Sequence, residues 1–349
     1  MDLDSVLGSA GRLRLAHLPT PLERMARLTE HLGGPQLWVK RDDLTGLGLG
    51  GNKVRKLEFV LPDALERGAD VLVTAGVEQS NSVRQIAAAA AVVGLDCHVI
   101  RLTDRVAATP ASKVPTGNAF LTQLFGATVR EVRWTGDRAA AIVGAAEDLA
   151  AAGRRPYVVP YGVSNPMGAL GYVAAALELA DQLETAGITA SAVIHASGSG
   201  GTQAGLVVGF AASGVEVIGV DVDAEPDRIR AEVSSIAVQL ANDLELDGRG
   251  IDASIEIAGG FAGPAYGSIT DSALEAIDLA ARFEGLVLDP VYSAKAFGAM
   301  IAMVRGGRFS RHQHVVFVHT GGAPSLLAMP DILGRIVPMR RPQSAGSDG

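Results

Sequence analysis

The amino-acid sequence predicts an α/β fold made of open, twisted, mostly parallel sheets with helices on both faces. Three observations support this prediction. Short runs rich in β-branched residues alternate with alanine-rich stretches, as they do in doubly wound sheets. The runs are apolar throughout rather than at every second position, which is typical of strands covered on both faces. Glycine is abundant, with 42 residues in 349, and it permits many turns between strands and helices.

The predicted strands and helices alternate along the chain. Strands are expected at residues 71–74, 97–102, 128–132, 192–196, 217–222 and 314–319. Helices are expected at residues 83–93, 118–125, 138–152, 202–212 and 272–284, and an amphipathic helix is expected after residue 53. Repeated strand–helix units of this length favour parallel strands joined by helical crossovers.

Two segments rich in turn-forming residues divide the chain, namely Gly46–Asn52 (GLGLGGN) and Pro160–Gly168 (PYGVSNPMG). The polar C-terminal segment RRPQSAGSDG favours disorder. The predicted division is therefore a large domain of residues 1–53 and 166–336, a small α/β domain of residues 54–165 and a disordered tail of residues 337–349.

Composition limits the classes of partner. The formal net charge of −8 and the 5% of aromatic residues argue against a nucleic-acid partner and an anionic membrane surface. No apolar run reaches the roughly 18 residues that a membrane helix needs, and the N-terminus does not resemble a signal peptide. Cys97 is the only cysteine, so we expect no disulfide and no four-cysteine zinc site, and we interpret it as a buried structural thiol. We therefore expect a cytoplasmic protein without a metal.

Lys53 stands between two glycines and the start of the expected amphipathic helix, in the segment Gly50–Glu58 (GGNKVRKLE). The positive end of the helix dipole disfavours a charged amine at such a position. A less basic amine is a better nucleophile toward a carbonyl group, which a lysine that forms a Schiff base requires. The alternative is an ordinary surface lysine in a basic helix start that also holds Arg55 and Lys56.

A run of small residues, ASGSGGTQAG at Ala196–Gly205, follows an apolar strand and opens an apolar helix. Backbone N–H groups of such a turn can converge on an anion at the helix N-terminus, and the hydroxyl groups of Ser199 and Thr202 add donors. Gln203 replaces the third glycine of a dinucleotide-binding loop, and no Gly-Lys-Ser/Thr follows as in a Walker A loop. We interpret the segment as the site of a single terminal phosphate; a tight structural turn is the alternative.

Three further segments carry polar or phenolic side chains. Gln79–Gln85 (QSNSVRQ) lies at the end of a strand, where open α/β sheets bind ligands, although its serine and asparagine residues could merely cap the next helix. Tyr266 and Tyr292 lie in the loops GPAY and DPVY and are candidates for phenol groups that face a pocket. His319–Pro324 (HTGGAP) is a polar stop after another strand. Each segment could also be purely structural.

Taken together, the segments resemble the D-cysteine desulfhydrase and 1-aminocyclopropane-1-carboxylate (ACC) deaminase family of fold-type II enzymes, which use pyridoxal 5′-phosphate (PLP). The resemblance extends over nearly the whole chain. It rests on nine ordered segments: LPTPLERM, WVKRDD, GGNKVRKLEF, QSNSVRQ, TGNAFLTQLFGA, SNPMGALGY, SGSGGTQAG, LDPVYSAKA and HTGGAP.

The resemblance implies roles for individual residues. Lys53 matches the lysine that forms the Schiff base with PLP and moves protons, and Asn52 flanks it. Asn81 matches the residue that is hydrogen-bonded to the 3′-oxygen of the cofactor, and Ser80 matches the serine that faces the substrate. The remaining matches are the phosphate cup (Gly198, Ser199, Gly200, Gly201 and Thr202), the two active-site tyrosines (Tyr266 and Tyr292) and the residue near the pyridine nitrogen (Thr320).

The sequence departs from the pattern of the family at two positions. Ser82 stands where the family usually has histidine, which removes an aromatic, titratable group near the pocket and leaves the substrate open. Ser293 stands where ACC deaminases resemble one another in having glutamate, and a neutral residue there favours simple elimination over ring opening. The segments LPTPLERM and DPVYSAK are also similar to the L-cysteate sulfo-lyase branch of the family.

The activity implied by the resemblance is α,β-elimination from a small amino acid such as D-cysteine or L-cysteate. The substrate amine displaces Lys53 from the cofactor, the Cα proton is removed, and sulfide or sulfite leaves; hydrolysis then yields pyruvate and ammonia. Lys53 is the expected base, with Ser80 or Tyr292 moving protons on the other face. We also expect a homodimer. The alternatives are ring opening as in ACC deaminase, a β-replacement synthase and a PLP-binding protein without turnover.

Overall fold

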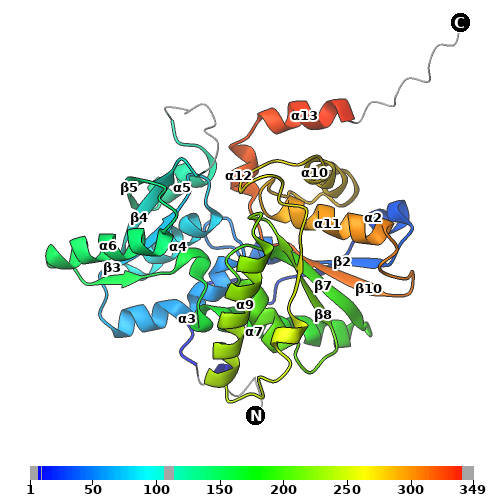
Figure 1. Ribbon diagram of the computed structural model, residues 1–349, viewed down its shortest axis with the longest axis horizontal. Helices are drawn as coiled ribbons and strands as arrows, with labels where there is room; N and C mark the ends of the chain where they lie inside the picture. The colour runs from blue at the N-terminus through cyan, green and yellow to red at the C-terminus, as the bar shows by residue number, and fades with distance from the viewer. Residues whose placement is uncertain (1–6, 9, 106–113, 340–349) are drawn as a thin grey trace, which may run out of the picture.

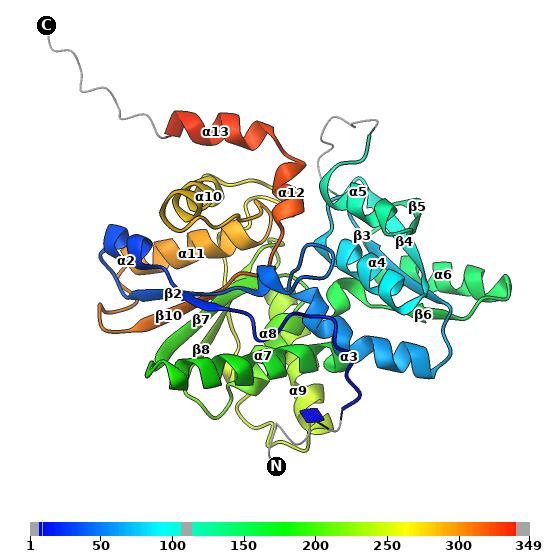
Figure 2. The same cartoon turned by 180° about the vertical axis from the view of Figure 1, so that it is seen from behind.

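Two open, twisted sheets flanked by helices organise the part of the chain that the computed structural model describes, residues 7–8, 10–105 and 114–339. The sheets lie side by side, each in its own half of the molecule (Figure 1). Helix α3 (Lys53–Glu66) packs against α7 (Pro166–Thr185) where the two halves join (Figure 2). The backbones approach so closely there that a Cβ atom on Gly171 would overlap the carbonyl group of Arg55.

The larger sheet has six strands in the order β1-β2-β10-β7-β8-β9. All neighbours are parallel except β1, which pairs with β2 in the antiparallel sense. The strands are β1 (Leu22–Arg24), β2 (Gln36–Lys40), β7 (Ala190–Ser197), β8 (Glu216–Asp221), β9 (Glu256–Ala258) and β10 (His314–Val318). In the centre of this sheet Val316 of β10 lies opposite Trp38 of β2 and Val193 of β7. Strands from the beginning and the end of the chain are therefore neighbours in the sheet.

The smaller sheet has four parallel strands in the order β5-β4-β3-β6. They are β3 (Val71–Gly76), β4 (Asp96–Thr103), β5 (Thr128–Arg133) and β6 (Pro156–Val158). The whole sheet lies inside the small domain that the sequence analysis places at residues 54–165. The exact domain limits stay a prediction.

Helices connect the strands. They are α2 (Ala26–Leu32), α3, α4 (Asn81–Val93), α5 (Gly117–Leu124), α6 (Arg138–Ala151), α7, α8 (Gly201–Gly209), α9 (Pro226–Asp243), α10 (Asp271–Glu284), α11 (Ser293–Arg305), α12 (Ala323–Leu327) and α13 (Asp331–Met339), with short 3-10 turns η1 (Asp42–Leu44), η2 (Tyr161–Val163) and η3 (Asp252–Ser254). None of the helices among the described residues is long and apolar enough to cross a membrane.

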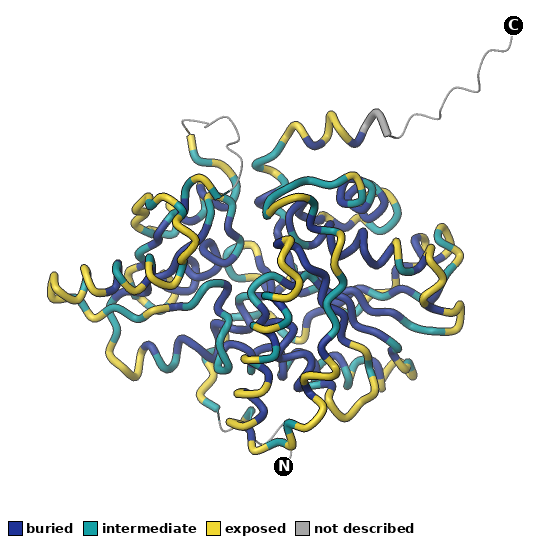
Figure 3. Tube along the Cα trace, in the orientation of Figure 1, coloured by how far each residue is buried: buried dark blue, intermediate teal, exposed yellow. Residues whose placement is uncertain are grey.

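Both faces of each sheet are buried along its central strands, as the continuous apolar runs predict, whereas the edge strand β5 is mostly exposed. In the larger sheet Phe317 packs into one cluster with Phe297, whereas its neighbours Val316 and Val193 face a second cluster. The smaller sheet is covered in the same way on its two faces. Buried residues therefore gather along the strands and at the junction of the halves (Figure 3). Cys97 is buried in the smaller sheet, and burial raises the pKa of its thiol to about 12.

Every strand and helix that the sequence analysis predicts is present, with ends that differ by a few residues. The sequence analysis did not predict β1, β2, β6, β9, α2, α7, α9, α11, α12 and α13. Strands of three residues, such as β1, β6 and β9, are too short to show a pattern, and the glycines inside α7 weaken its helix signal. The predicted tail of residues 337–349 begins inside α13, and its residues 340–349 lie outside the described part of the chain.

Candidate active site

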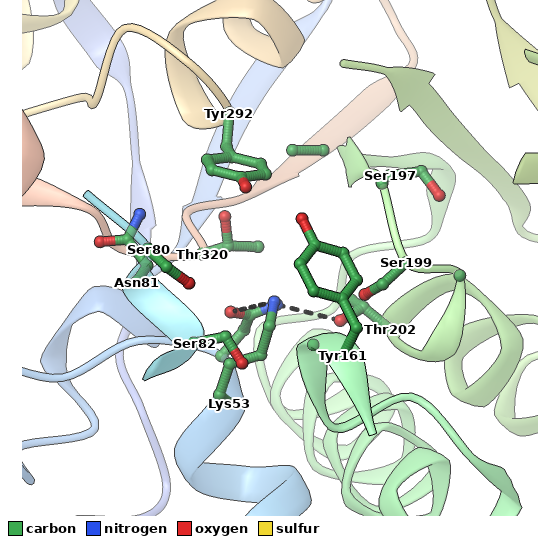
Figure 4. A pocket seen from close by; sticks show the side chains of 15 residues that line it. Lys53, Ser80, Asn81, Ser82, Tyr161, Ser197, Ser199, Thr202, Tyr292 and Thr320 are labelled. Atoms are coloured by element: carbon green, nitrogen blue, oxygen red, sulfur yellow. Dashed lines mark hydrogen bonds between the residues drawn. The ribbon is translucent and has the colours of Figure 1, made fainter. Parts of the chain in front are cut away.

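The carboxyl ends of the parallel strands of both sheets meet around one pocket, the place where open α/β sheets bind ligands. Segments after β3, β7 and β10 and the start of α3 supply its walls (Figure 4). The pocket is lined by Asn52, Lys53, Ser80, Asn81, Ser82, Tyr161, Gly162, Ala196, Ser197, Gly198, Ser199, Gly200, Thr202, Tyr292 and Thr320. All site residues predicted from the sequence line it except Gly201 and Tyr266.

Lys53 is the first residue of α3, and its side chain points into the pocket (Figure 4). The side-chain oxygen of Gln85 accepts hydrogen bonds from the backbone N–H groups of Lys53 and Val54, at 2.9 and 3.2 Å, so it fixes the start of the helix. Burial lowers the pKa of Lys53 to about 8, although the charge of Asp289 acts in the opposite sense. An amine with this pKa is partly neutral at physiological pH and can attack a carbonyl group.

Asn52 joins three parts of the pocket. Its side-chain oxygen accepts a hydrogen bond from Lys53 Nζ at 3.1 Å, and its Nδ2 donates to Thr202 Oγ1 at 3.0 Å. Its backbone N–H donates to the carbonyl oxygen of Thr320 at 3.1 Å. Asn52 therefore holds the amine of Lys53 in a fixed position relative to the segments after β7 and β10.

The segment of residues 198–202 turns from β7 into α8. Gly200 precedes the helix with a φ of +79°, and a Cβ atom there would lie 3.1 Å from the backbone nitrogen of Val233, so glycine is the residue that fits. Gly201 does not face the pocket; its N–H donates to Ser164 Oγ at 3.2 Å. Ser164 in turn donates to Ser199 Oγ at 2.8 Å, which fixes the hydroxyl groups around the turn.

Lys56 lies directly behind this turn, one helical turn after Lys53. It is fully buried, and its Nζ donates to the carbonyl oxygen of Gly162 at 2.8 Å and to Ser164 Oγ at 2.9 Å. Burial lowers the pKa of Lys56 well below its ordinary value, and the charge of Lys53 lowers it further. Two amines and a helix N-terminus thus surround the turn, and this donor set fits the phosphate group of PLP.

Ser80, Asn81 and Ser82 occupy the turn between β3 and α4. Ser80 is the N-cap of α4, since its Oγ accepts a hydrogen bond from Val83 N–H at 3.3 Å, and it also lines the pocket. The side chain of Asn81 is held by Asn118, whose Nδ2 donates to Asn81 Oδ1 at 2.8 Å. Ser82 is buried and lines the pocket, and its Oγ has no hydrogen-bond partner among the described residues. Capping and pocket lining therefore coexist in this segment.

Two of the tyrosines form a pair. Tyr292 lines the pocket, whereas Tyr266 lies in the neighbouring cavity, and their hydroxyl oxygens are 2.5 Å apart. Burial raises the pKa of both phenols well above the ordinary value, so both carry their protons at neutral pH. A third tyrosine, Tyr161, lines the pocket opposite Tyr292 (Figure 4).

Sequence reasoning did not single out Tyr161, although the signal was present. Tyr161 lies between Pro160 and Gly162, and the same Gly/Pro setting identified Tyr266 and Tyr292. It was interpreted only as part of a turn between domains.

Asp289 is a second residue that sequence reasoning missed. Its buried carboxylate accepts hydrogen bonds from the N–H groups of Val291, Tyr292 and Ser293, at 3.0, 2.9 and 2.9 Å, and from Ser293 Oγ at 2.7 Å. These bonds set the course of the loop and so the position of Tyr292. Burial nevertheless raises the pKa of Asp289.

Among residues 7–8, 10–105 and 114–339 there is no group of three or more His, Cys, Asp or Glu side chains that could hold a metal ion. Ser197 Oγ, like that of Ser82, is buried beside the pocket without a partner in the described chain. Unpartnered hydroxyl groups, a less basic amine and a cup of N–H donors together fit a polar cofactor and a small polar substrate.

Comparisons with known proteins agree with this arrangement. Residues 13–321 match the family model for pyridoxal-phosphate dependent enzymes. The D-cysteine desulfhydrase of Serratia proteamaculans is 43% identical over 330 residues, which cover 94% of this chain and 98% of that protein. The D-cysteine desulfhydrase of Klebsiella pneumoniae subsp. pneumoniae is 44% identical over 319 residues, which cover 91% of this chain and 95% of that protein. A crystal structure described as an ACC deaminase homologue superposes with a TM-score of 0.85 at 31% identity and covers 96% of this chain and 98% of its own.

Proposed function

The chain belongs to the family of pyridoxal-phosphate dependent enzymes, and from this premise we propose that it eliminates sulfide from D-cysteine. The products would be pyruvate, ammonia and hydrogen sulfide, with one water consumed. The observation that carries the proposal is the position of Lys53, whose amine faces the pocket between the phosphate-cup turn and the serine of the QSN segment. D-cysteine is the substrate named for the two relatives that match nearly the whole chain.

The residues present fit the cofactor. Lys53 would hold PLP covalently, Gly198, Ser199, Gly200 and Thr202 would surround its phosphate, and Asn52, Asn81 and Thr320 would contact its ring. When bound, PLP supplies an electron-withdrawing ring that makes the Cα–H bond of the substrate acidic. The amine of Lys56 behind the cup donates a hydrogen bond to Ser164 Oγ and so supports the turn.

Proton transfers fall to residues around the amine. Lys53 Nζ would take the Cα proton, because a pKa near 8 matches a base that works near neutrality. Tyr292 keeps its proton at neutral pH and would donate it to the departing sulfur. Ser80 lines the pocket, and its hydroxyl group would hold the carboxylate of the substrate.

Ser293 favours elimination over the ring opening of an ACC deaminase. Its hydroxyl group and its N–H group both bind Asp289, at 2.7 and 2.9 Å, so Ser293 serves the loop that carries Tyr292. A neutral residue fully engaged in this way offers no carboxylate to the ring nitrogen of the cofactor.

We further propose that the protein is a homodimer in the cytoplasm, with the large and small domains limited as the sequence analysis predicts. Large apolar side chains are exposed on neighbouring helices, namely Phe120 and Leu124 of α5 and Leu327 of α12, and such a patch is typical of an interface. Light scattering of Leu327→Asp beside the unaltered protein would test the dimer.

The test is a pyruvate-release screen over D-cysteine, L-cysteine, L-cysteate, ACC, D-serine and β-chloroalanine, with Lys53→Ala as the control. Pyruvate and sulfide released in equal amounts from D-cysteine are expected. Release of α-ketobutyrate from ACC would instead identify a deaminase. A new amino acid formed when thiols are added would identify a β-replacement synthase, and no turnover of any substrate would leave a binding protein.

A further inference from the structure

A second cavity, of about 650 Å³, adjoins the candidate active site at the ends of β4 and β8. We call it the arginine cavity; its walls include Arg105, Trp134, Arg138, Tyr161, Asp223 and Tyr266. Tyr161 lines both the arginine cavity and the candidate active site. Tyr266 reaches the active site through its hydrogen bond to Tyr292. Tyr161 and the Tyr266–Tyr292 pair therefore lie between the two spaces.

The carboxylates of the arginine cavity are all paired. Asp223 accepts two hydrogen bonds from Arg105 Nη2, at 2.9 and 3.1 Å, and a further bond from Arg228. Glu225 and Glu232 also accept hydrogen bonds from Arg228. The three carboxylates of this cavity thus face three guanidinium groups, those of Arg105, Arg138 and Arg228.

Two guanidinium groups keep donors without a partner. Arg105 Nη1 and Arg138 Nε are buried and have no hydrogen-bond partner among the described residues. The side chain of Arg105 is only 9% exposed, so Nη1 is not satisfied by bulk water. A buried, charged donor left without an acceptor is costly, which indicates that a ligand supplies the acceptor.

Aromatic rings hold both groups in place. The Cζ atom of Arg105 lies 4.2 Å from the ring centroid of Tyr266 and 5.0 Å from that of Trp134. The Cζ atom of Arg138 lies 3.5 Å from the ring centroid of Tyr161. Stacked guanidinium groups with fixed planes are well suited to oxyanions, because their N–H groups match pairs of oxygen atoms.

We propose that the arginine cavity is a subsite for a small oxyanion and that Arg105 determines specificity for substrates whose β-substituent carries one, such as the sulfonate group of L-cysteate. This rests on the proposed function, since it assigns to the same site a preference among β-substituents. During turnover the anion is a group of the substrate itself. When no substrate is present, a free anion of the same chemistry binds to the arginine cavity instead. Asp223 anchors Arg105 and leaves Nη1 for the ligand.

The binding test uses the holoenzyme, in which the cofactor phosphate fills the cup. Emission of Trp134 is followed while methanesulfonate or sulfate is added against chloride at constant ionic strength, because screening alone alters exposed pairs. Sulfite is avoided since it reacts with aldehydes. A saturable change is expected that is absent in Trp134→Phe and that needs at least about tenfold more anion in Arg105→Met, the usual effect of losing a charge-assisted hydrogen bond. A linear or unchanged response overturns the subsite.

Two further variants accompany the binding test, one as a control and one as an alternative to Arg105→Met. Arg249→Met removes an exposed arginine whose partner is Asp247, and it is expected to titrate like the unaltered enzyme. Arg138→Met removes the second guanidinium group and leaves the Arg105–Asp223 pair intact. It is expected to weaken methanesulfonate binding, and it replaces Arg105→Met in the test if that variant does not fold. Equal weakening in Arg249→Met would mean that the effect is nonspecific and would overturn the proposal.

The specificity test measures kcat/KM for L-cysteate and D-cysteine. Arg105→Met is expected to lower the ratio of L-cysteate to D-cysteine by at least about tenfold. An equal loss for both substrates would give Arg105 a structural role only and overturn its specificity role. The binding test needs no turnover, so methanesulfonate binding in a protein that eliminates from neither amino acid would refute the proposed function and leave the subsite intact.

Discussion

The hydroxyl oxygens of Tyr266 and Tyr292 lie 2.5 Å apart, although 26 positions separate the residues in the chain. Their rings meet edge to face, with centroids 6.1 Å apart. Only Tyr292 faces the candidate active site. The pair thus joins Tyr292, the proposed proton donor, to Tyr266, whose ring is stacked on Arg105 in the arginine cavity.

We predict that Tyr292→Phe lowers kcat by about 10²–10⁴-fold, because it removes the proton donor for the leaving group. Tyr266→Phe keeps that donor and removes only its partner, so a smaller loss is expected. Steady-state rates with D-cysteine and with β-chloroalanine check this, since chloride leaves without a proton. A loss in Tyr292→Phe that is the same for both substrates would contradict the assignment.

Covalent attachment of PLP to the apoenzyme is predicted to accelerate with pH and to level off above about 8, because the neutral amine of Lys53 is the reactive form. An ordinary lysine, with a pKa of 10.5, would still accelerate at pH 10. The rate is followed by absorbance, with Nα-acetyl-lysine as the reference for titration of the cofactor itself. Borohydride reduction and mass spectrometry should locate the adduct on Lys53; an adduct on Lys56 would refute the assignment.

Gly200→Ala is predicted to weaken PLP binding, because a Cβ atom at φ +79° strains the turn that cradles the phosphate. Gly214→Ala is the matched control, since Gly214 has a φ of +72° and open space around its Cβ position. Both variants should lose about 1–2 kcal/mol of stability from the left-handed backbone. Only Gly200→Ala should lose cofactor in equilibrium dialysis; equal retention by both would mean that the cup lies elsewhere.

Ser82→His is predicted to change the ranking of D-cysteine, L-cysteate and ACC. Ser82 lines the pocket with an unpartnered hydroxyl group, and Ser80 rather than Ser82 caps α4. An imidazole is larger and titrates near neutrality, so it changes both the space and the charge next to the substrate. Specificity constants for the three substrates check this beside Ser310→His, an exposed control. An unaltered ranking with a shifted melting temperature would give Ser82 a structural role alone.

Acid is predicted to destabilise the protein through Glu178 of α7, which accepts bonds from Arg55 at 3.0 and 2.8 Å. Burial alone would raise the pKa of Glu178, but Arg55 and Lys40 outweigh it and lower the pKa from 4.5 to about 2. The unfolded chain therefore binds more protons between these values, so the contribution is complete above pH 4.5 and is lost as pH falls toward 2.

At most about 3 kcal/mol depends on this ionisation. Denaturant titrations between pH 5 and 2 should show a shallower loss of stability in Glu178→Gln. This variant is also less stable at neutral pH because Arg55 loses one of its two carboxylate partners and keeps only Asp42. Asp148→Gln, at an exposed pair with Arg130, is the control and should follow the unaltered protein. The same slope in all three proteins would contradict the role of Glu178.

Local patterns were enough for most of the secondary structure and for several pocket segments. The strands β3, β4, β7 and β10 lie in mainly apolar runs, because both of their faces are covered, and they were predicted on that basis. The segments around Lys53, Ser80 and Gly200 lie at strand or helix ends, where sequence signals for turns are strong. Resemblance to a family then related these segments to one another.

By itself the sequence determined which short segments could bind a phosphate, attack a carbonyl group or end a strand, because such chemistry depends on a few adjacent residues. Only the tertiary structure decided which distant side chains meet. Arg55 and Glu178 are 123 positions apart, and Arg105 and Asp223 are 118 apart. Both pairs depend on how the two sheets are placed, and hydrophobic periodicity reports the buried face of an element but not the partner that covers it. The arginine cavity, the tyrosine pair and the position of Lys56 behind the phosphate cup all depend on the tertiary structure.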